Sequence, residues 1–252
     1  MSETALRLAI FAGVLAVLMM VELLHPWREA QARGRRWPSN LGLIVLDSLI
    51  LRLVFPLSAV GVAIIAEAQG WGLFHRFGVP GWLAFAASLL LLDLIIYAQH
   101  VVFHHVPLLW RFHRVHHADT VLDVTTGLRF HPVEMVLSML VKFGAVVALG
   151  LPAGAVVAFE VLLNATSMFN HANIALPPAI ERVLRLIVVT PEMHRVHHST
   201  IRAETDSNFG FNLPWWDRVF GTYQDGPRRG YDGMTIGLET FRDGKESRLD
   251  RL

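Results

Sequence analysis

Long apolar runs separated by short polar stretches fill the first two thirds of the chain. They are Leu6–Leu24, Leu41–Ala66, Val79–Phe103, Val133–Leu149 and Pro152–Phe169. A helix needs about 20 mostly apolar residues to cross a bilayer. The last two runs meet at residues 150–152, where Gly and Pro predict a hairpin with an external turn. The pattern therefore predicts an all-α, integral-membrane helical bundle of about four spans with a cytoplasmic, histidine-rich helical cap.

Basic residues are placed unevenly between these runs. Arg28, Arg33, Arg35 and Arg36 follow the first run, whereas the loops at 67–81 and 150–152 carry only Arg76. Loops rich in Lys and Arg lie on the cytoplasmic side of a membrane. We therefore expect an external N-terminus, and a cytoplasmic cap, active site and C-terminus, in a bacterial inner membrane.

Charged residues inside an apolar run need partners, because an isolated charge in a bilayer is costly. We expect Asp47 and Arg52 in the second run to pair with each other or to face water near the cytoplasmic end. Glu160, in the fifth run, is expected to pair inside the bundle.

Composition agrees with a membrane protein. Hydrophobic residues make up 53% of the 252 residues, charged residues make up 17%, and the mean hydropathy is +0.43. A net charge of +1 indicates no nucleic-acid partner, and the absence of Cys excludes disulfides and thiolate metal sites. We interpret residues 1–252 as one domain. Its parts are N-terminal spans (1–84), a metal-binding catalytic region (85–225) and a polar C-terminal tail (226–252).

Histidines are concentrated in three groups. His113 to His117 and His194 to His198 both read H-R-V-H-H, and His100 and His104 lie four residues apart. Positions i, i+3 and i+4 share one face of a helix, so each group presents its imidazoles together. His105 lies about 100° around the helix from its neighbour and is expected to point away.

Eight clustered imidazoles exceed what one metal ion can bind, so they predict a two-metal centre. Imidazole suits Zn, Cu, Fe and Ni. The competing interpretation is that these are surface histidines, or core histidines satisfied by hydrogen bonds. Metal-binding histidines also need acceptors that fix their tautomers. The candidate acceptors are Asp93, Asp119, Asp123, Glu192 and Asp206. A buried centre in such a protein should act on an apolar molecule that enters from the bilayer.

The three groups resemble motifs of one family. H-x-x-x-H at 100–104, followed by H-x-x-H-H at 113–117 and again at 194–198, is similar to the fatty acid hydroxylase/sterol desaturase superfamily of integral-membrane non-haem di-iron enzymes. R-F-H-P-V-E at 129–134, F-N-H-A-N at 169–173 and the stretch 205–223 also look like family elements. The resemblance covers roughly residues 85–225.

The resemblance implies a function and a fuller ligand set. It adds His131 and His171 to the metal ligands, with Asn170 as a further candidate acceptor. It implies two iron ions, for which zinc can substitute in purified samples, and O₂-dependent hydroxylation or desaturation of a lipid such as a sterol or fatty acyl chain. Electrons would come from a separate donor, a ferredoxin or small cytochrome with its reductase.

Two other functions remain open from the sequence. In a haem-binding electron-transfer protein, histidines would serve as axial ligands, but the His-His doublets would then be redundant. A zinc-dependent membrane hydrolase would also use histidine ligands.

Overall fold

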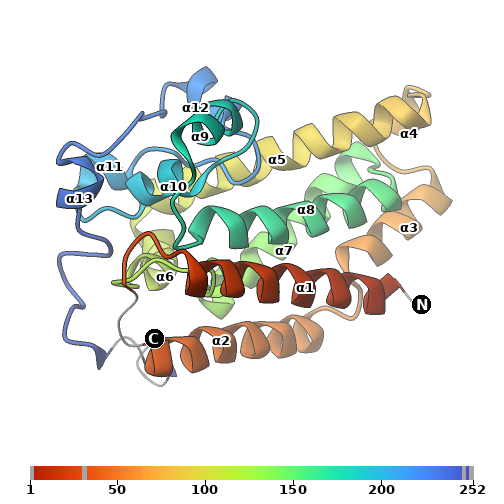
Figure 1. Cartoon of the computed structure of the whole chain (residues 1–252). Coiled ribbons are helices and arrows are strands. Elements are labelled where there is room, and N and C mark those ends of the chain that lie inside the picture. The colour runs from red at the N-terminus through yellow and green to blue at the C-terminus, as the bar shows by residue number, and fades with distance from the viewer. Residues whose placement is uncertain (1–2, 30–32, 246–247, 250–252) are drawn as a thin grey trace.

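Long helices form a bundle, and shorter helices cap one end of it (Figure 1). The computed structural model describes residues 3–29, 33–245 and 248–249. The long helices lie mostly side by side, with the N-terminus at the end of the bundle opposite the cap. In the described residues the helices are α1 (Glu3–Leu24), α2 (Arg33–Val54), α3 (Ala59–Gln69), α4 (Leu73–Arg76), α5 (Gly81–His105), α6 (Pro107–His117), η1 (Thr126–Leu128), α7 (Pro132–Leu149), α8 (Ala153–His171), α9 (Pro178–Leu184), α10 (Pro191–His197), α11 (Arg202–Thr205), α12 (Trp215–Phe220) and α13 (Gly230–Gly233).

The helical membrane protein predicted from the sequence is confirmed in its architecture. Within the described ranges, five helical stretches, rather than about four, are long and apolar enough to cross a membrane. They are α1, the stretch Arg33–Arg76, α5, α7 and α8. The count rises because α7 and α8 have 18 and 19 residues, so each arm of the hairpin is long enough to span.

Local sequence explains where these helices break. Pro56 lies between α2 and α3, and Ser58 caps α3 by accepting a hydrogen bond from the backbone N–H of Gly61 at 3.1 Å. Gly150 ends α7 with φ of 73°, a left-handed conformation that favours glycine. A Cβ on Gly72 would lie 2.1 Å from the nitrogen of Gly150. The turn before α4 can therefore pack this closely against the hairpin only because residue 72 is glycine.

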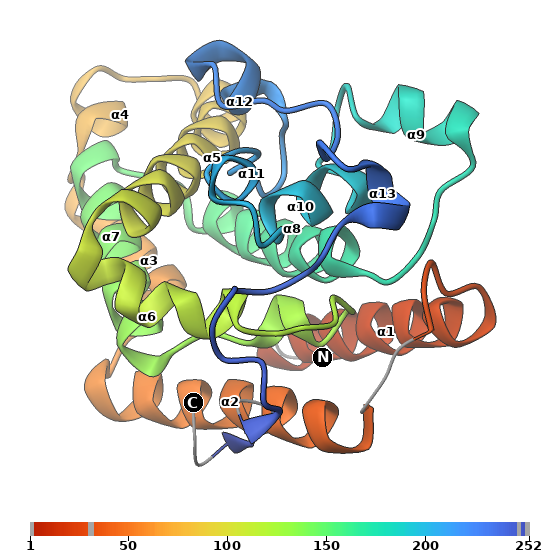
Figure 2. The ribbon, with the colours of Figure 1, turned by 90° about the vertical axis from the view of Figure 1, so that its left-hand side faces the viewer.

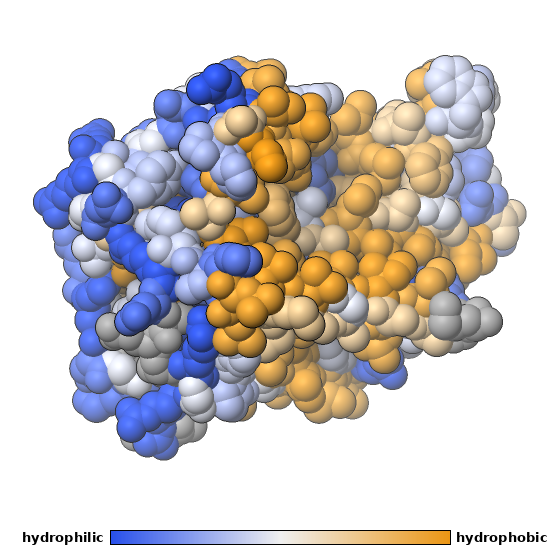
Figure 3. Space-filling view, in the orientation of Figure 1, coloured by the Kyte–Doolittle hydropathy of each residue, from blue (hydrophilic) through white to orange (hydrophobic). Residues whose placement is uncertain are grey.

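Two apolar cores hold the bundle together, and its outside is also apolar. The larger core joins α3, α5, α7 and α8 around Leu92, Val146 and Phe159. The smaller one packs α1 and α2 against Val124, Leu128 and Met168. Figure 3 shows apolar residues over much of the visible bundle surface and hydrophilic residues gathered over the cap. Such a boundary fits a bundle in lipid and a cap in water.

The cap covers the end of the bundle that the sequence predicts to be cytoplasmic. α6, α10, α11 and α13 lie together at that end, and the C-terminal segment runs across them toward α2 (Figure 2). The cap has a small core of its own around Leu122, Met234 and Ile236.

The charges inside the bundle behave in two ways. Glu160 pairs with Lys142 at 3.0 Å and with Arg7, which confirms the expected pairing within the bundle. The expected pair of Asp47 with Arg52 is not found among the described residues, and Asp47 is buried instead. Residues five positions apart on a helix lie about 140° apart, so these two side chains leave α2 in different directions.

Candidate metal centre

Nine buried histidines converge at the junction of bundle and cap. They form two sets. Within each set every histidine offers one ring nitrogen, and these nitrogens all lie within 4.8 Å of one another. The first set is His100, His104, His113, His117 and His197, and the second is His116, His171, His194 and His198. Eight of the nine imidazoles come from α5, α6, α8 and α10, and the ninth, His198, directly follows α10.

The two sets adjoin each other. His117 of the first set stacks on His198 of the second, with ring centroids 4.4 Å apart. On α6, His113 and His117 belong to the first set and His116 belongs to the second, so one helix contributes to both. The structure therefore presents two neighbouring sites rather than one.

Nitrogen positions within the sets suit metal binding. His171 Nε2 lies 3.0 Å from the Nε2 atoms of both His116 and His194, and His100 Nε2 lies 3.0 Å from His113 Nε2. Imidazole nitrogens bound about 2 Å from one ion lie roughly 3 Å from each other.

The outward-facing Nδ1 atoms of six histidines have acceptors. Backbone carbonyls of Phe209, Arg129, Ser167 and Ser207 accept from His100, His116, His171 and His197, at 2.6–3.1 Å. Carboxylates of Glu134 and Asp206 lie 2.8 and 3.3 Å from Nδ1 of His113 and His104. An Nδ1–H bonded outward leaves the Nε2 lone pair pointing inward, which is the tautomer that a metal requires.

Burial favours the neutral form of five of these imidazoles. It lowers the pKa of His116, His117, His194 and His198 well below the usual value, with neighbouring imidazoles adding to the effect. Burial also lowers the pKa of His197 to about 3. Nε2 of His104, His117 and His197 has no hydrogen-bond partner among the described residues. Buried imidazole nitrogens without partners fit a first-row transition metal in the first set, to which all three belong.

Of the acceptors predicted from sequence, Asp206 is the one that contacts a histidine. The others bind elsewhere: Asp119 and Asp123 bind Arg36, Glu192 accepts from the backbone of Leu176, and Asn170 donates to the carbonyl of Phe211. Asp93 accepts from Asn212, Leu213 and Trp216.

Asp93 nevertheless acts on the site through the chain segment that it holds. Asn212 and Trp216 each donate to it at 2.8 Å, and Asp217 accepts from the backbone of Phe209 at 2.8 Å. Together these carboxylates fix residues 209–217, whose first carbonyl meets His100. The same face of α5 carries Asp93 and His100, as the spacing predicts, but the two do not bind each other.

His131, a predicted ligand, lies outside both sets. Its Nδ1 accepts from the backbone N–H of Val133 at 3.1 Å, which makes it the N-cap of α7. The sequence contains the reason, because Pro132 suits the first position of a helix and leaves the preceding residue to cap it. Three residues on, Glu134 contacts His113 instead.

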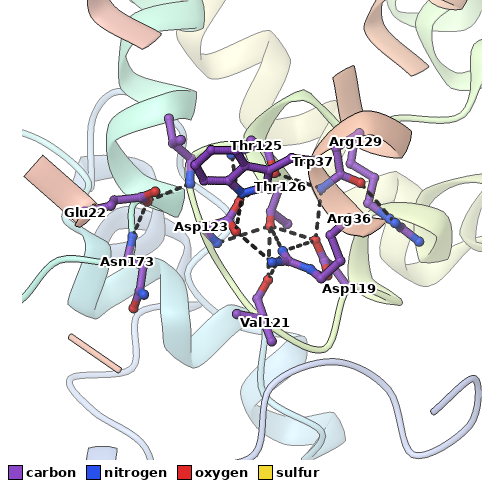
Figure 4. A network of polar contacts seen from close by, with 12 residues as sticks. Glu22, Arg36, Trp37, Asp119, Val121, Asp123, Thr125, Thr126, Arg129 and Asn173 are labelled. Atoms are coloured by element: carbon purple, nitrogen blue, oxygen red, sulfur yellow. Dashed lines mark hydrogen bonds and ion pairs between the residues drawn. The ribbon is translucent and has the colours of Figure 1, made fainter. Parts of the chain in front are cut away.

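A buried ion-pair network fastens the loop between α6 and α7 (Figure 4). The Arg36 guanidinium lies 2.6 Å from Asp119 and 2.7 Å from Asp123. Asn40 donates to Asp119 at 3.2 Å and accepts from Arg129 at 3.1 Å. Since the carbonyl of Arg129 faces His116, α2 indirectly positions a metal-facing histidine.

A cavity of about 140 Å³ leads into the bundle from the first set. His100 and His113 line the cavity together with residues of α2, α5, α7 and α8. Most of the lining is apolar, including Ile96, Phe103 and Leu163.

Gly127 sets how closely η1 approaches α8 beside the second set. A Cβ at Gly127 would lie 2.7 Å from the carbonyl of Ser167 and 3.2 Å from His171 Nδ1. We expect Gly127→Ala to destabilise the fold by about 1–3 kcal/mol, the usual cost of overpacking, and to lower the metal content. The control is Gly13→Ala, because no atom lies within 4 Å of a Cβ there. Equal metal content and thermal midpoints in both variants would contradict this prediction.

Comparison with known proteins agrees with the geometry. A sequence model of the family described as fatty acid hydroxylase matches residues 85–222. The chain belongs to the fatty acid hydroxylase family. The match covers the segments that carry all nine histidines of the two sets. No solved structure matches the chain.

Several curated relatives resemble this family member along most of its length. An ornithine lipid hydroxylase from Rhizobium tropici is 29% identical over 234 residues, which are 87% of this chain and 67% of the relative. Alkylglycerol monooxygenases from Danio rerio and Homo sapiens are 32% and 30% identical over 89% of this chain. The chain spans about half the length of these monooxygenases, 49% in each.

Proposed function

We propose that this chain is a membrane-bound, O₂-dependent lipid hydroxylase that holds two iron ions. The observation that carries the proposal is the position of nine buried imidazoles in two adjoining sets, the first of which borders a mainly apolar cavity. The names of the relatives support a lipid substrate, because they describe hydroxylation of an ornithine lipid and mono-oxygenation of an alkylglycerol. Haem would leave only two axial positions per iron, fewer than the five and four imidazoles present.

The reaction converts a C–H bond and O₂, with two electrons and two protons, into C–OH and water. A separate redox protein, a ferredoxin or small cytochrome with its reductase, supplies the electrons. Bound iron would supply O₂ activation. The protein holds the imidazoles in one tautomer through Phe209, Arg129 and Glu134, and the cavity places an apolar chain against His100 and His113. A substrate drawn from the bilayer avoids exposing its chain to water, which costs about 0.8 kcal/mol per CH₂.

The test is oxygen incorporation by the purified protein. Iron-loaded protein in lipid nanodiscs, supplied with a reductase and a ferredoxin, is expected to transfer one labelled oxygen atom from isotopic O₂ to a membrane lipid. Iron chelation should abolish the transfer, and zinc should not restore it. Loss of two hydrogens without oxygen gain would identify a desaturase instead, and a visible Soret band would identify a haem protein.

Orientation is a separate prediction. The Arg-rich cap is expected in the cytoplasm, because segments rich in Lys and Arg stay on that side of the membrane. Five crossings, an odd number, then put the N-terminus on the outside. An alkaline phosphatase fusion at the C-terminus should be inactive, whereas a green fluorescent protein fusion should be fluorescent. A phosphatase active at the C-terminus would contradict this orientation.

A further inference from the structure

Three residues that line the cavity beside the first histidine set each carry a buried acceptor oxygen without a partner. They belong to Asp47 on α2, Gln99 on α5 and Glu134 on α7, and all three residues line the cavity. Asp47 Oδ1, Gln99 Oε1 and Glu134 Oε2 are buried and have no hydrogen-bond partner among the described residues. A buried acceptor left unpaired costs about 1–3 kcal/mol, so the unpaired oxygens indicate a ligand that donates hydrogen bonds.

The charges around the cavity specify the ligand further. Asp47 on α2 and Glu134 on α7 both line this cavity, and the two helices pack against each other. Lys142, the cation that lines the same cavity, is already paired with Glu160 at 3.0 Å. Glu134 contacts His113 through its other oxygen, and Asp47 forms no ion pair among the described residues. Two neighbouring carboxylates without a free cation favour a positively charged donor between them.

We propose, on the basis of the hydroxylase function above, that the substrate is a lipid whose polar group carries a protonated amine, which binds between Asp47 and Glu134. An ammonium group has three N–H donors, the number of unpaired acceptors. Because Glu134 also touches His113, the amine lies near the first set, and the carbons closest to it are presented to the metals. The apolar chain occupies the remainder of the cavity between Ile96 and Leu163.

The test compares matched single-chain lipids by native mass spectrometry of the metal-loaded protein in detergent, which reports bound lipid and bound metal together. The probes are hexadecylamine, hexadecanol and hexadecyl methyl ether. A charge-assisted hydrogen bond is roughly twice as strong as a neutral one, so we expect the amine to bind about tenfold more tightly than the alcohol. The ether, which has no donor, should bind weakest.

Substitution of Asp47 assigns the preference to a residue. Asp47→Asn keeps an acceptor but removes the charge, and it should reduce the preference for amine over alcohol to less than threefold. Asp47→Leu removes the acceptor as well as the charge, so it should weaken the binding of both the amine and the alcohol. This variant therefore separates the loss of the hydrogen-bond acceptor from the loss of the charge. Ser48→Ala is the control, because Ser48 is exposed on the same helix and bonds only to the carbonyl of Ile44. Metal content should be the same in all four proteins.

Equal binding of amine and alcohol to the unsubstituted protein, or an unchanged preference in Asp47→Asn, would overturn the proposal. The two proposals fail separately. Tight amine binding without oxygen incorporation into any lipid would refute the hydroxylase function alone. Oxygen incorporation into lipids without an amine, with no preference in binding, would refute the amine site alone. A product whose new hydroxyl lies within the first few carbons from the amine would support the proposal.

Discussion

His104→Ala is expected to remove the metal from the first histidine set and to abolish turnover, whereas His105→Ala is expected to leave metal content and turnover unchanged. His104 is buried with its Nε2 facing the other imidazoles of its set. His105 is exposed, and its ring bonds back to the carbonyl of Val101 at 2.8 Å. The substitution removes one of the five imidazole nitrogens of the set, and the other four are held in place by their own helices and cannot close the gap. The affinity for the metal should therefore fall sharply. Elemental analysis and product formation measure the two effects.

Neighbouring histidines make this a matched comparison. The two variants remove the same side chain from adjacent positions of α5, so a general effect of the substitution would appear in both. His25 and His75 are exposed and provide further controls. The same loss is expected for alanine at each of the other eight histidines of the two sets. If His105→Ala removed the metal while His104→Ala left metal content and turnover unchanged, the face of α5 that carries His104 would not be the one that faces the site.

Arg36→Met is expected to destabilise the protein by about 3–5 kcal/mol, the cost of breaking a buried ion pair by removing one partner. The substitution leaves Asp119 and Asp123 buried without their cation. For a chain of this size the thermal midpoint should fall by roughly 10 °C. Because Asn40 and Arg129 connect Asp119 to the carbonyl facing His116, metal content should fall as well.

The pH dependence of stability gives the same prediction a second measurement. Burial by itself would raise the pKa of Asp119, but Arg36 outweighs it and lowers this pKa from 3.8 to about 2. A carboxylate whose pKa is lower in the folded state stabilises the fold above its unfolded pKa, and this contribution is lost as pH falls from about 4 to 2. Arg36→Met should abolish this contribution.

A surface ion pair provides the control for Arg36. Lys245 and Asp243 are 2.8 Å apart with 72% and 53% of their side chains exposed, and such pairs contribute about 0–1 kcal/mol. Lys245→Met should therefore leave the thermal midpoint and the metal content nearly unchanged. Equal shifts in both variants would mean that the network of Arg36 is not a specific support of the site.

The amino-acid sequence alone was sufficient for the helical architecture and for eight of the nine histidines. Apolar run length and helix periodicity are local properties, so the spacing in 113–117 and 194–198 could be interpreted without knowing how the helices pack. His171 was expected only from the family resemblance. His131 was expected on the same basis, and the capping geometry imposed by Pro132 places it elsewhere.

Tertiary structure decided how the histidines divide and what orients them. Four of the six Nδ1 acceptors are backbone carbonyls, which every residue has, so no residue type marks them in the sequence. Arg36 and Asp119 are 83 positions apart, and which acidic residue a basic one meets depends on how α2 packs on the loop after α6. The unpaired oxygens of Asp47 and Glu134 become neighbours only when α2 and α7 form walls of one cavity. Spacing along one helix is set by its own geometry, whereas contacts between helices depend on packing across the whole bundle.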